Sequence, residues 1–109
     1  MKPWFIVFKK LPANAMAIFP FIIIKWKGQK DDKILINHEK IHLRQQLELL
    51  ILPFYFLYLL NYLTNLLKYK NHHQAYFNIS FEKEAYHYEN ELNYLAHRKW
   101  YNWINFYSL

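Results

Sequence analysis

The sequence contains no cysteine among its 109 residues and only one glycine. The lack of cysteine excludes disulfides, thiolate metal sites, iron–sulfur clusters and thiol nucleophiles, so any metal site must use His, Asp or Glu. Low-complexity disorder is also excluded, because 54% of the residues are hydrophobic and 21% are aromatic. The length suits one hydrophobic core, and we expect residues 1–109 to form a single domain.

The chain has an excess of basic residues, with a formal net charge of +6. Such a charge is typical of proteins that bind nucleic acid, anionic membranes or acidic partners. Lys, Ile, Asn, Phe and Tyr are abundant and share AT-rich codons, so we attribute this character mainly to codon usage and do not expect nucleic acid as a partner. The apolar run Trp4–Phe8 ends at two lysines, which is too short for a signal peptide. The expected location is therefore the cytoplasm or the cytoplasmic membrane.

The N-terminal quarter of the sequence is rich in residues that favour β-strands. Segments 4–8 and 15–26 are apolar and are separated by a turn at residues 11–14, a pattern that predicts a β-hairpin. Pro20 indicates that the second strand lies at a sheet edge or is interrupted at that residue.

The remainder of the chain is predicted to be helical, which gives an α+β fold that is predominantly helical. One long helix is expected from about residue 33, with Asp31 or Asp32 as its N-cap, and a break at Pro53. Residues 71–74 are expected to form a polar loop. A C-terminal helix is expected over residues 81–97, with Ser80 as its N-cap, and an aromatic tail would dock Trp100, Trp103 and Ile104 into the core.

An apolar stretch over residues 49–67 has two interpretations. Its central twelve residues are more typical of a buried helix than of a membrane span, and we favour a core helix. Extended to Leu67, however, the stretch is nearly long enough to span a bilayer, and the tyrosines and lysines at 62 and 68–70 resemble interfacial anchors. Association with a membrane through residues 49–67 therefore remains the second interpretation.

The motif HExxH at residues 38–42 predicts a metal site. Residues four apart on a helix lie on one face, so the imidazoles of His38 and His42 can bind one metal ion. Glu39 lies about 100° further round and can reach a water molecule on the metal. Zinc lowers the pKa of such a water, and a carboxylate can take its proton as the oxygen attacks a carbonyl. We therefore expect zinc as the cofactor and Glu39 as the catalytic base.

A catalytic zinc requires a third protein ligand, which is expected from the later helix. Glu82 and Glu84 are both available there, but residues two apart diverge by about 200° and only one of them can face the metal. Ala85 is small enough to allow this helix close to the HExxH helix. Gln45 and Gln46 are expected to hydrogen-bond the metal-binding histidines, and His87 and Tyr86 to stabilise an oxyanion.

Two segments of the chain resemble a group of small bacterial HExxH proteins. The shared pattern is HExxHxxQ, an apolar helix with a proline, and N-x-x-FExEAY, which here spans His38 to Tyr86. More distantly the chain is similar to gluzincin peptidases, in which a Glu from a later helix completes the site in an E-x-x-A-D or E-x-E-A-N motif. This resemblance implies a minimal zincin-like fold with Glu82 as the third zinc ligand and Glu84 as the alternative. It also implies that a carboxylate beside the metal ligands is missing, because Tyr86 replaces the Asp or Asn of the motif.

The expected function is zinc-dependent hydrolysis of peptide bonds in a peptide or protein substrate. One alternative is a zinc site that only stabilises the fold. Another is a small membrane-associated protein in which the HExxH motif is incidental. The sequence predicts neither the substrate nor the oligomeric state.

Overall fold

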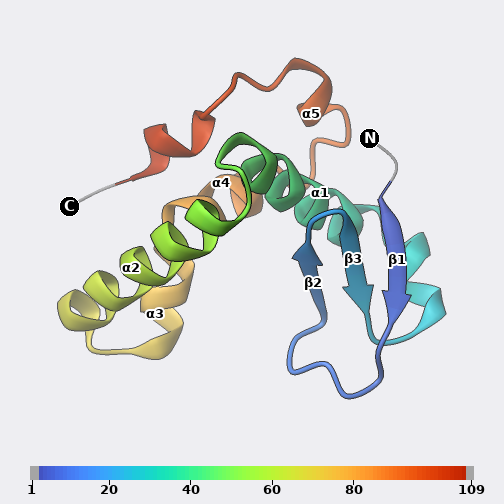
Figure 1. Ribbon diagram of the computed structural model, residues 1–109, viewed down its shortest axis with the longest axis horizontal. Coiled ribbons are helices and arrows are strands. Elements are labelled where there is room, and N and C mark those ends of the chain that lie inside the picture. The colour runs from blue at the N-terminus through green and yellow to red at the C-terminus, as the bar shows by residue number, and fades with distance from the viewer. Residues whose placement is uncertain (1–2, 108–109) are drawn as a thin grey trace.

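A computed structural model describes residues 3–107, which form a small sheet packed against helices (Figure 1). The prediction of an α+β fold that is predominantly helical is confirmed. The strands are β1 (Trp4–Val7), β2 (Ala15–Ile18) and β3 (Phe21–Ile24). The helices are α1 (Lys33–Glu48), α2 (Leu52–Tyr69), α3 (His72–Phe77), α4 (Ser80–Tyr88) and α5 (Tyr94–His97), with 3₁₀ turns η1 (Lys27–Asp31) and η2 (Asn102–Phe106).

The three-stranded sheet has the order β1-β3-β2. The predicted hairpin between segments 4–8 and 15–26 is wrong, because β1 pairs with β3 in parallel, with Trp4 opposite Phe21. Segment 15–26 instead folds back on itself at Pro20, so that β2 and β3 form the antiparallel hairpin. Of the two possibilities predicted at Pro20, a strand at the sheet edge or an interrupted strand, the interruption occurs. Ile22 and Ile24 of the central strand are fully buried against α1, and this contact fixes the sheet on the HExxH helix.

The long predicted helix is divided into two helices that bend by 112°. Asp32 accepts a hydrogen bond from the backbone N–H of Leu35 and caps α1 as predicted. The helix ends at Glu48, before the proline, and Leu50 and Ile51 in the connection to α2 have positive φ angles. Pro53 lies in the first turn of α2, where its missing N–H has no helical partner to lose, so it starts a helix rather than kinking one.

The C-terminal half also differs from the prediction. Residues 72–77 form the short helix α3 rather than a loop, because Asn71 caps its N-terminus by accepting from the N–H of Gln74. The expected helix over residues 81–97 stops at Tyr88 and resumes as α5. Ser80 is not the N-cap, since its backbone N–H instead donates to Oδ1 of Asn61 on α2 at 2.8 Å.

Helix α1 lies at the centre of the fold and contacts both the sheet and α4 (Figure 1). Ile41 of α1 and Ala85 of α4 are fully buried in one apolar cluster, so the small side chain of Ala85 brings the two helices together as predicted. The aromatic tail docks less completely than predicted. Trp103 packs on Phe81 with ring centroids 4.8 Å apart, but Trp100 and Ile104 remain 60% and 55% exposed.

Candidate metal centre

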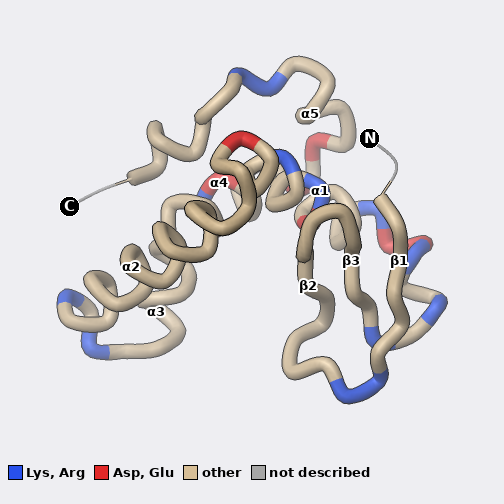
Figure 2. The backbone as a smooth tube through the Cα atoms, in the orientation of Figure 1, with Lys and Arg blue, Asp and Glu red and all other residues tan. Residues whose placement is uncertain are grey.

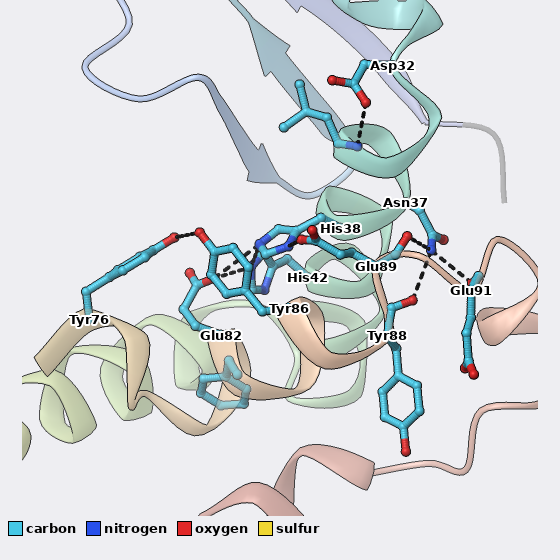
Figure 3. A network of polar contacts seen from close by, with 12 residues as sticks. Asp32, Asn37, His38, His42, Tyr76, Glu82, Tyr86, Tyr88, Glu89 and Glu91 are labelled. Atoms are coloured by element: carbon cyan, nitrogen blue, oxygen red, sulfur yellow. Dashed lines mark hydrogen bonds and ion pairs between the residues drawn. The ribbon is translucent and has the colours of Figure 1, made fainter. Parts of the chain in front are cut away.

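Three side chains from α1 and α4 converge on one point (Figure 3). Oε1 of Glu82 lies 3.2 Å from Nε2 of His38 and 3.0 Å from Nε2 of His42, and the two Nε2 atoms are 3.2 Å apart. All three residues are buried. The structure thus brings together the two histidines of the motif and the third ligand predicted for them, and this group can hold a metal ion.

The spacing of these three atoms fits a four-coordinate metal ion such as zinc. Zinc binds nitrogen and oxygen at about 2.0–2.2 Å, and a tetrahedral arrangement then places neighbouring ligand atoms about 3.3 Å apart. The separations of 3.0 to 3.2 Å are close to that value. Two imidazole nitrogens and a carboxylate oxygen are also the donor set of His₂Glu zinc sites.

The outer nitrogen of each histidine has a hydrogen-bond partner. Nδ1 of His42 lies 2.8 Å from Oε1 of Gln45, and Nδ1 of His38 lies 2.8 Å from Oε1 of Glu89. Both partners are acceptors, so each imidazole donates from Nδ1 and turns Nε2 to the centre, where its lone pair can bind a metal once Nε2 is unprotonated. Gln45 has the role predicted for it.

Glu89 supplies the carboxylate that the replacement at Tyr86 was expected to remove. It lies in the turn after α4, and the side chain of Asn37 determines the path of that turn. Nδ2 of Asn37 contacts the backbone carbonyls of Tyr88, Glu89 and Glu91 at 3.4, 2.9 and 3.0 Å (Figure 3). The residue that precedes the HExxH motif therefore ends α4 and positions the acid that orients His38.

The two candidate glutamates of α4 have different surroundings. Oε2 of Glu82 accepts a hydrogen bond from the hydroxyl of Tyr58 at 2.6 Å, which leaves Oε1 for the metal position. Glu84 instead lies in a buried group with Arg98, and its Oε1 accepts from Nε2 of Gln45 at 2.9 Å. The structure therefore places Glu82, not Glu84, beside the histidines.

Glu39 lies between two pockets that meet at the metal centre. One pocket has a volume of about 540 Å³ and extends past Tyr86 and Glu89. The other has a volume of about 410 Å³ and extends past Met16 and Phe54. His38, Glu39 and Tyr76 line both pockets, so the HExxH glutamate, although largely buried, lies where the two pockets adjoin. Burial raises the pKa of Glu39, although the neighbouring histidines oppose this effect.

A pair of tyrosines forms one wall of the larger pocket. The ring of Tyr86 packs edge-on against His38 with centroids 4.4 Å apart, and its hydroxyl lies 3.0 Å from that of Tyr76. Burial raises the pKa of both hydroxyls, so they remain protonated donors. The sequence pattern indicated Tyr86 but not Tyr76, which comes from the unpredicted helix α3.

Two residues proposed for the site lie elsewhere. Gln46 does not contact the histidines, because its side chain bonds the sheet edge: its Oε1 accepts from Phe19 N–H and its Nε2 donates to Ala17 C=O. His87 is exposed and packs on Phe106, with ring centroids 5.6 Å apart. It is five residues from Glu82 and therefore points about 140° away from it around α4.

Comparisons of the chain with models of known protein families, with curated proteins and with solved structures gave no match. Any function assigned to the centre therefore rests on its own geometry.

Proposed function

We propose that the protein is a zinc-dependent hydrolase that cleaves peptide bonds, with a minimal zincin-like site built on α1 and α4. The observation that carries this proposal is the convergence of His38, His42 and Glu82 at zinc-ligand spacing, with Glu39 in the lining of two pockets beside them. The opening beside the three side chains favours catalysis over a purely structural site, because a structural zinc site keeps no free position.

The residues present fit zinc, which His38, His42 and Glu82 would hold. Bound there, zinc would supply Lewis-acid chemistry, polarising a carbonyl group and making water acidic enough to ionise near neutral pH. Glu82 is kept anionic for this role, because the adjacent histidines lower its pKa in spite of its burial.

Glu39 would act as the general base. Its carboxylate takes a proton from the attacking water and later delivers it to the amine that leaves. A base is most effective when its pKa approaches the working pH, and burial shifts the pKa of Glu39 in that direction. The hydroxyls of Tyr76 and Tyr86 are donors in the pocket wall and would stabilise the negative charge on the carbonyl oxygen.

The pocket on the α2 side suits an apolar side chain of a peptide substrate. Its lining combines Met16 and Ala17 of the edge strand with the aromatic residues Phe54, Tyr55 and Tyr58 of α2. The pocket on the other side carries the polar groups of Asn14, Asp32 and Glu89. We therefore expect cleavage next to an apolar residue in extended peptides.

Metal content and cleavage together test this proposal. Wild type is expected to retain one zinc ion, and His42→Ala and Glu82→Ala to lose it. His87→Ala is the matched control, because it removes an exposed histidine from the helix that carries Glu82.

Glu39→Gln distinguishes catalysis from a structural role of the metal. The variant should keep zinc but lose cleavage of a fluorogenic peptide library by a factor on the order of 100 or more. Wild type without stoichiometric zinc would exclude the proposal. Zinc with equal, negligible cleavage in wild type and Glu39→Gln would indicate a site that only stabilises the fold.

A further inference from the structure

Helix α2 exposes a continuous apolar surface. We name as the α2 apolar face six side chains that are between 45% and 79% exposed: Leu52, Phe56, Leu59, Leu60, Leu63 and Leu67. At about 100° per residue they fall within an arc of roughly 100° on the helix. Proteins that function as monomers in water seldom leave such a surface uncovered.

The opposite side of α2 is buried and carries two asparagines beside the apolar residue Phe54. Asn61 accepts the N–H of Ser80 through Oδ1, and Nδ2 of Asn65 donates to the carbonyl of Ala75 at 3.1 Å. Tyr58 on the same side bonds Glu82 in the metal centre. A helix on the surface of a water-soluble domain normally keeps its apolar residues inward. Here the hydrogen bonds hold Asn61 and Asn65 inward, and the leucines on the other side of α2 remain exposed.

Apolar residues of the C-terminal segment extend the exposed surface. Ile104 and Tyr107 line a furrow of about 400 Å³ together with Leu57 and Leu60 of α2. Ile104 is 55% exposed and Tyr107 is 47% exposed.

The charges around this surface identify its partner. Residues 49–81 contain no Asp or Glu, and Lys68 and Lys70 lie at the C-terminal end of α2 (Figure 2). Lysines beside exposed aliphatic and aromatic residues are typical of segments that bind anionic lipid surfaces. A net charge of +6 would oppose the pairing of two copies but favours attraction to such a surface.

Within residues 3–107 no single helix is long and apolar enough to cross a bilayer; only α1 and α2 together pass that test, as a pair bent by 112°. A helix that lies in the plane of the membrane surface is consistent with this length limit and with the apolar side chains on the exposed side of α2. We infer that the α2 apolar face inserts into the interface of an anionic lipid bilayer. This inference does not depend on the proposed hydrolase activity.

Flotation with lipid vesicles tests the inference. Wild type should float with vesicles of phosphatidylcholine and phosphatidylglycerol in equal parts, and less with phosphatidylcholine alone. The variant Phe56→Glu/Leu63→Glu should bind at least about tenfold more weakly, because it places charge in the inserted face. Its control is Trp4→Glu/Leu92→Glu, which makes the same change in charge at residues that are 66% and 51% exposed and lie outside α2.

A labelling experiment tests insertion of the α2 apolar face without changing the charge of the protein. The chain has no natural cysteine, so Leu63→Cys and Leu92→Cys can each carry one environment-sensitive fluorophore. Anionic vesicles should shift the emission of the label at residue 63 to the blue and leave that at residue 92 unchanged.

Three results would overturn the inference. The first is wild type that does not float with the anionic vesicles. The second is equal loss of binding in the two double variants, which would indicate a nonspecific effect of charge. The third is a lipid-free dimer that Phe56→Glu/Leu63→Glu converts to a monomer, in a protein that does not bind vesicles. That outcome would show that a second copy covers the face.

Discussion

At the scale of single residues, Glu89 determines how His38 is presented to the metal position. Its carboxylate accepts the Nδ1 proton of that imidazole at 2.8 Å and is itself partly buried. A carboxylate in this position fixes the ring orientation and strengthens Nε2 as a donor to metal. The residue is thus a positioning group rather than a ligand.

Replacing Glu89 should weaken zinc binding without unfolding the protein. We expect Glu89→Ala to reduce zinc affinity by about 10- to 100-fold, because His38 loses its orienting partner. Competition with a chromophoric chelator measures this change. Glu91→Ala is the control, since Glu91 lies in the same turn but contacts Asn37 only through its backbone carbonyl. Equal affinities in the two variants would contradict the role given to Glu89.

The histidine ligands and Glu39 could be predicted from the sequence, whereas the roles of Glu89 and Asn37 could not. His38, Glu39 and His42 lie within one helical repeat, so their geometry follows from local spacing alone. Glu89 is 51 residues from His38, and the contact requires the turn that Asn37 imposes. An acid in a loop and an asparagine before a motif carry no local signal of such a contact.

At the scale of elements, Arg98 joins three parts of the chain. Its guanidinium contacts Glu48 at the end of α1 and Glu84 of α4, and all three side chains are fully buried. The hydroxyl of Tyr94 also donates to Glu84. Arg98 lies just after α5, so this group fixes the C-terminal segment over the junction of α1 and α4 (Figure 1).

Removal of this arginine should destabilise the fold strongly. We expect Arg98→Met to lower the free energy of unfolding by about 3–5 kcal/mol, because it leaves two buried carboxylates without a counter-charge. Arg98→Lys should retain only part of the stability that Arg98 provides, since an ammonium group cannot bridge both acids with paired hydrogen bonds. Chemical denaturation measures the effect. Arg44→Met, on the half-buried side of α1, should change stability by less than about 1 kcal/mol, and a comparable loss there would refute the assignment.

Among the elements, helices with local caps were predictable and the sheet order was not. Asp32 marks the start of α1 through a bond within four residues. The parallel pairing of β1 with β3 instead depends on which strand buries its isoleucines against α1. The burial of Asn61 and Asn65 on α2 was also hidden, because a run of leucines shows how apolar a helix is but not which side it buries.

At the scale of the whole molecule, the metal centre couples stability to pH. Burial lowers the pKa of His42, but the charge of Glu82 outweighs it and raises the pKa from 6.5 to about 9. Protonated His42 therefore stabilises the metal-free fold fully below pH 6.5, and this contribution is lost as the pH rises through about 9. Glu82 sets the acidic limit of this stable range. Its pKa is lowered in the fold, so the ionised carboxylate stabilises the fold fully above pH 4.5, and this stabilisation is lost as the pH falls further.

The metal-free and zinc-loaded proteins should therefore respond to pH in opposite directions. With a chelator present, stability should fall by up to about 3 kcal/mol between pH 6.5 and 9, the amount linked to the shift of His42. With zinc present it should rise over the same range, because the metal must displace the proton from the imidazole. Denaturation midpoints at both pH values measure this. The same trend with and without zinc would contradict the coupling.

The side chain of Gln46 has a consequence for the behaviour of the sheet. Its carboxamide offers one acceptor and one donor to Phe19 and Ala17, as the backbone of a fourth strand would. An unpaired edge strand is a template for aggregation, and proteins commonly block it with charge, proline or a covering element. Here one glutamine occupies that part of the edge. A further strand therefore cannot pair at that part of β2, while Ala15 at the other end of the strand lines both pockets beside the metal centre.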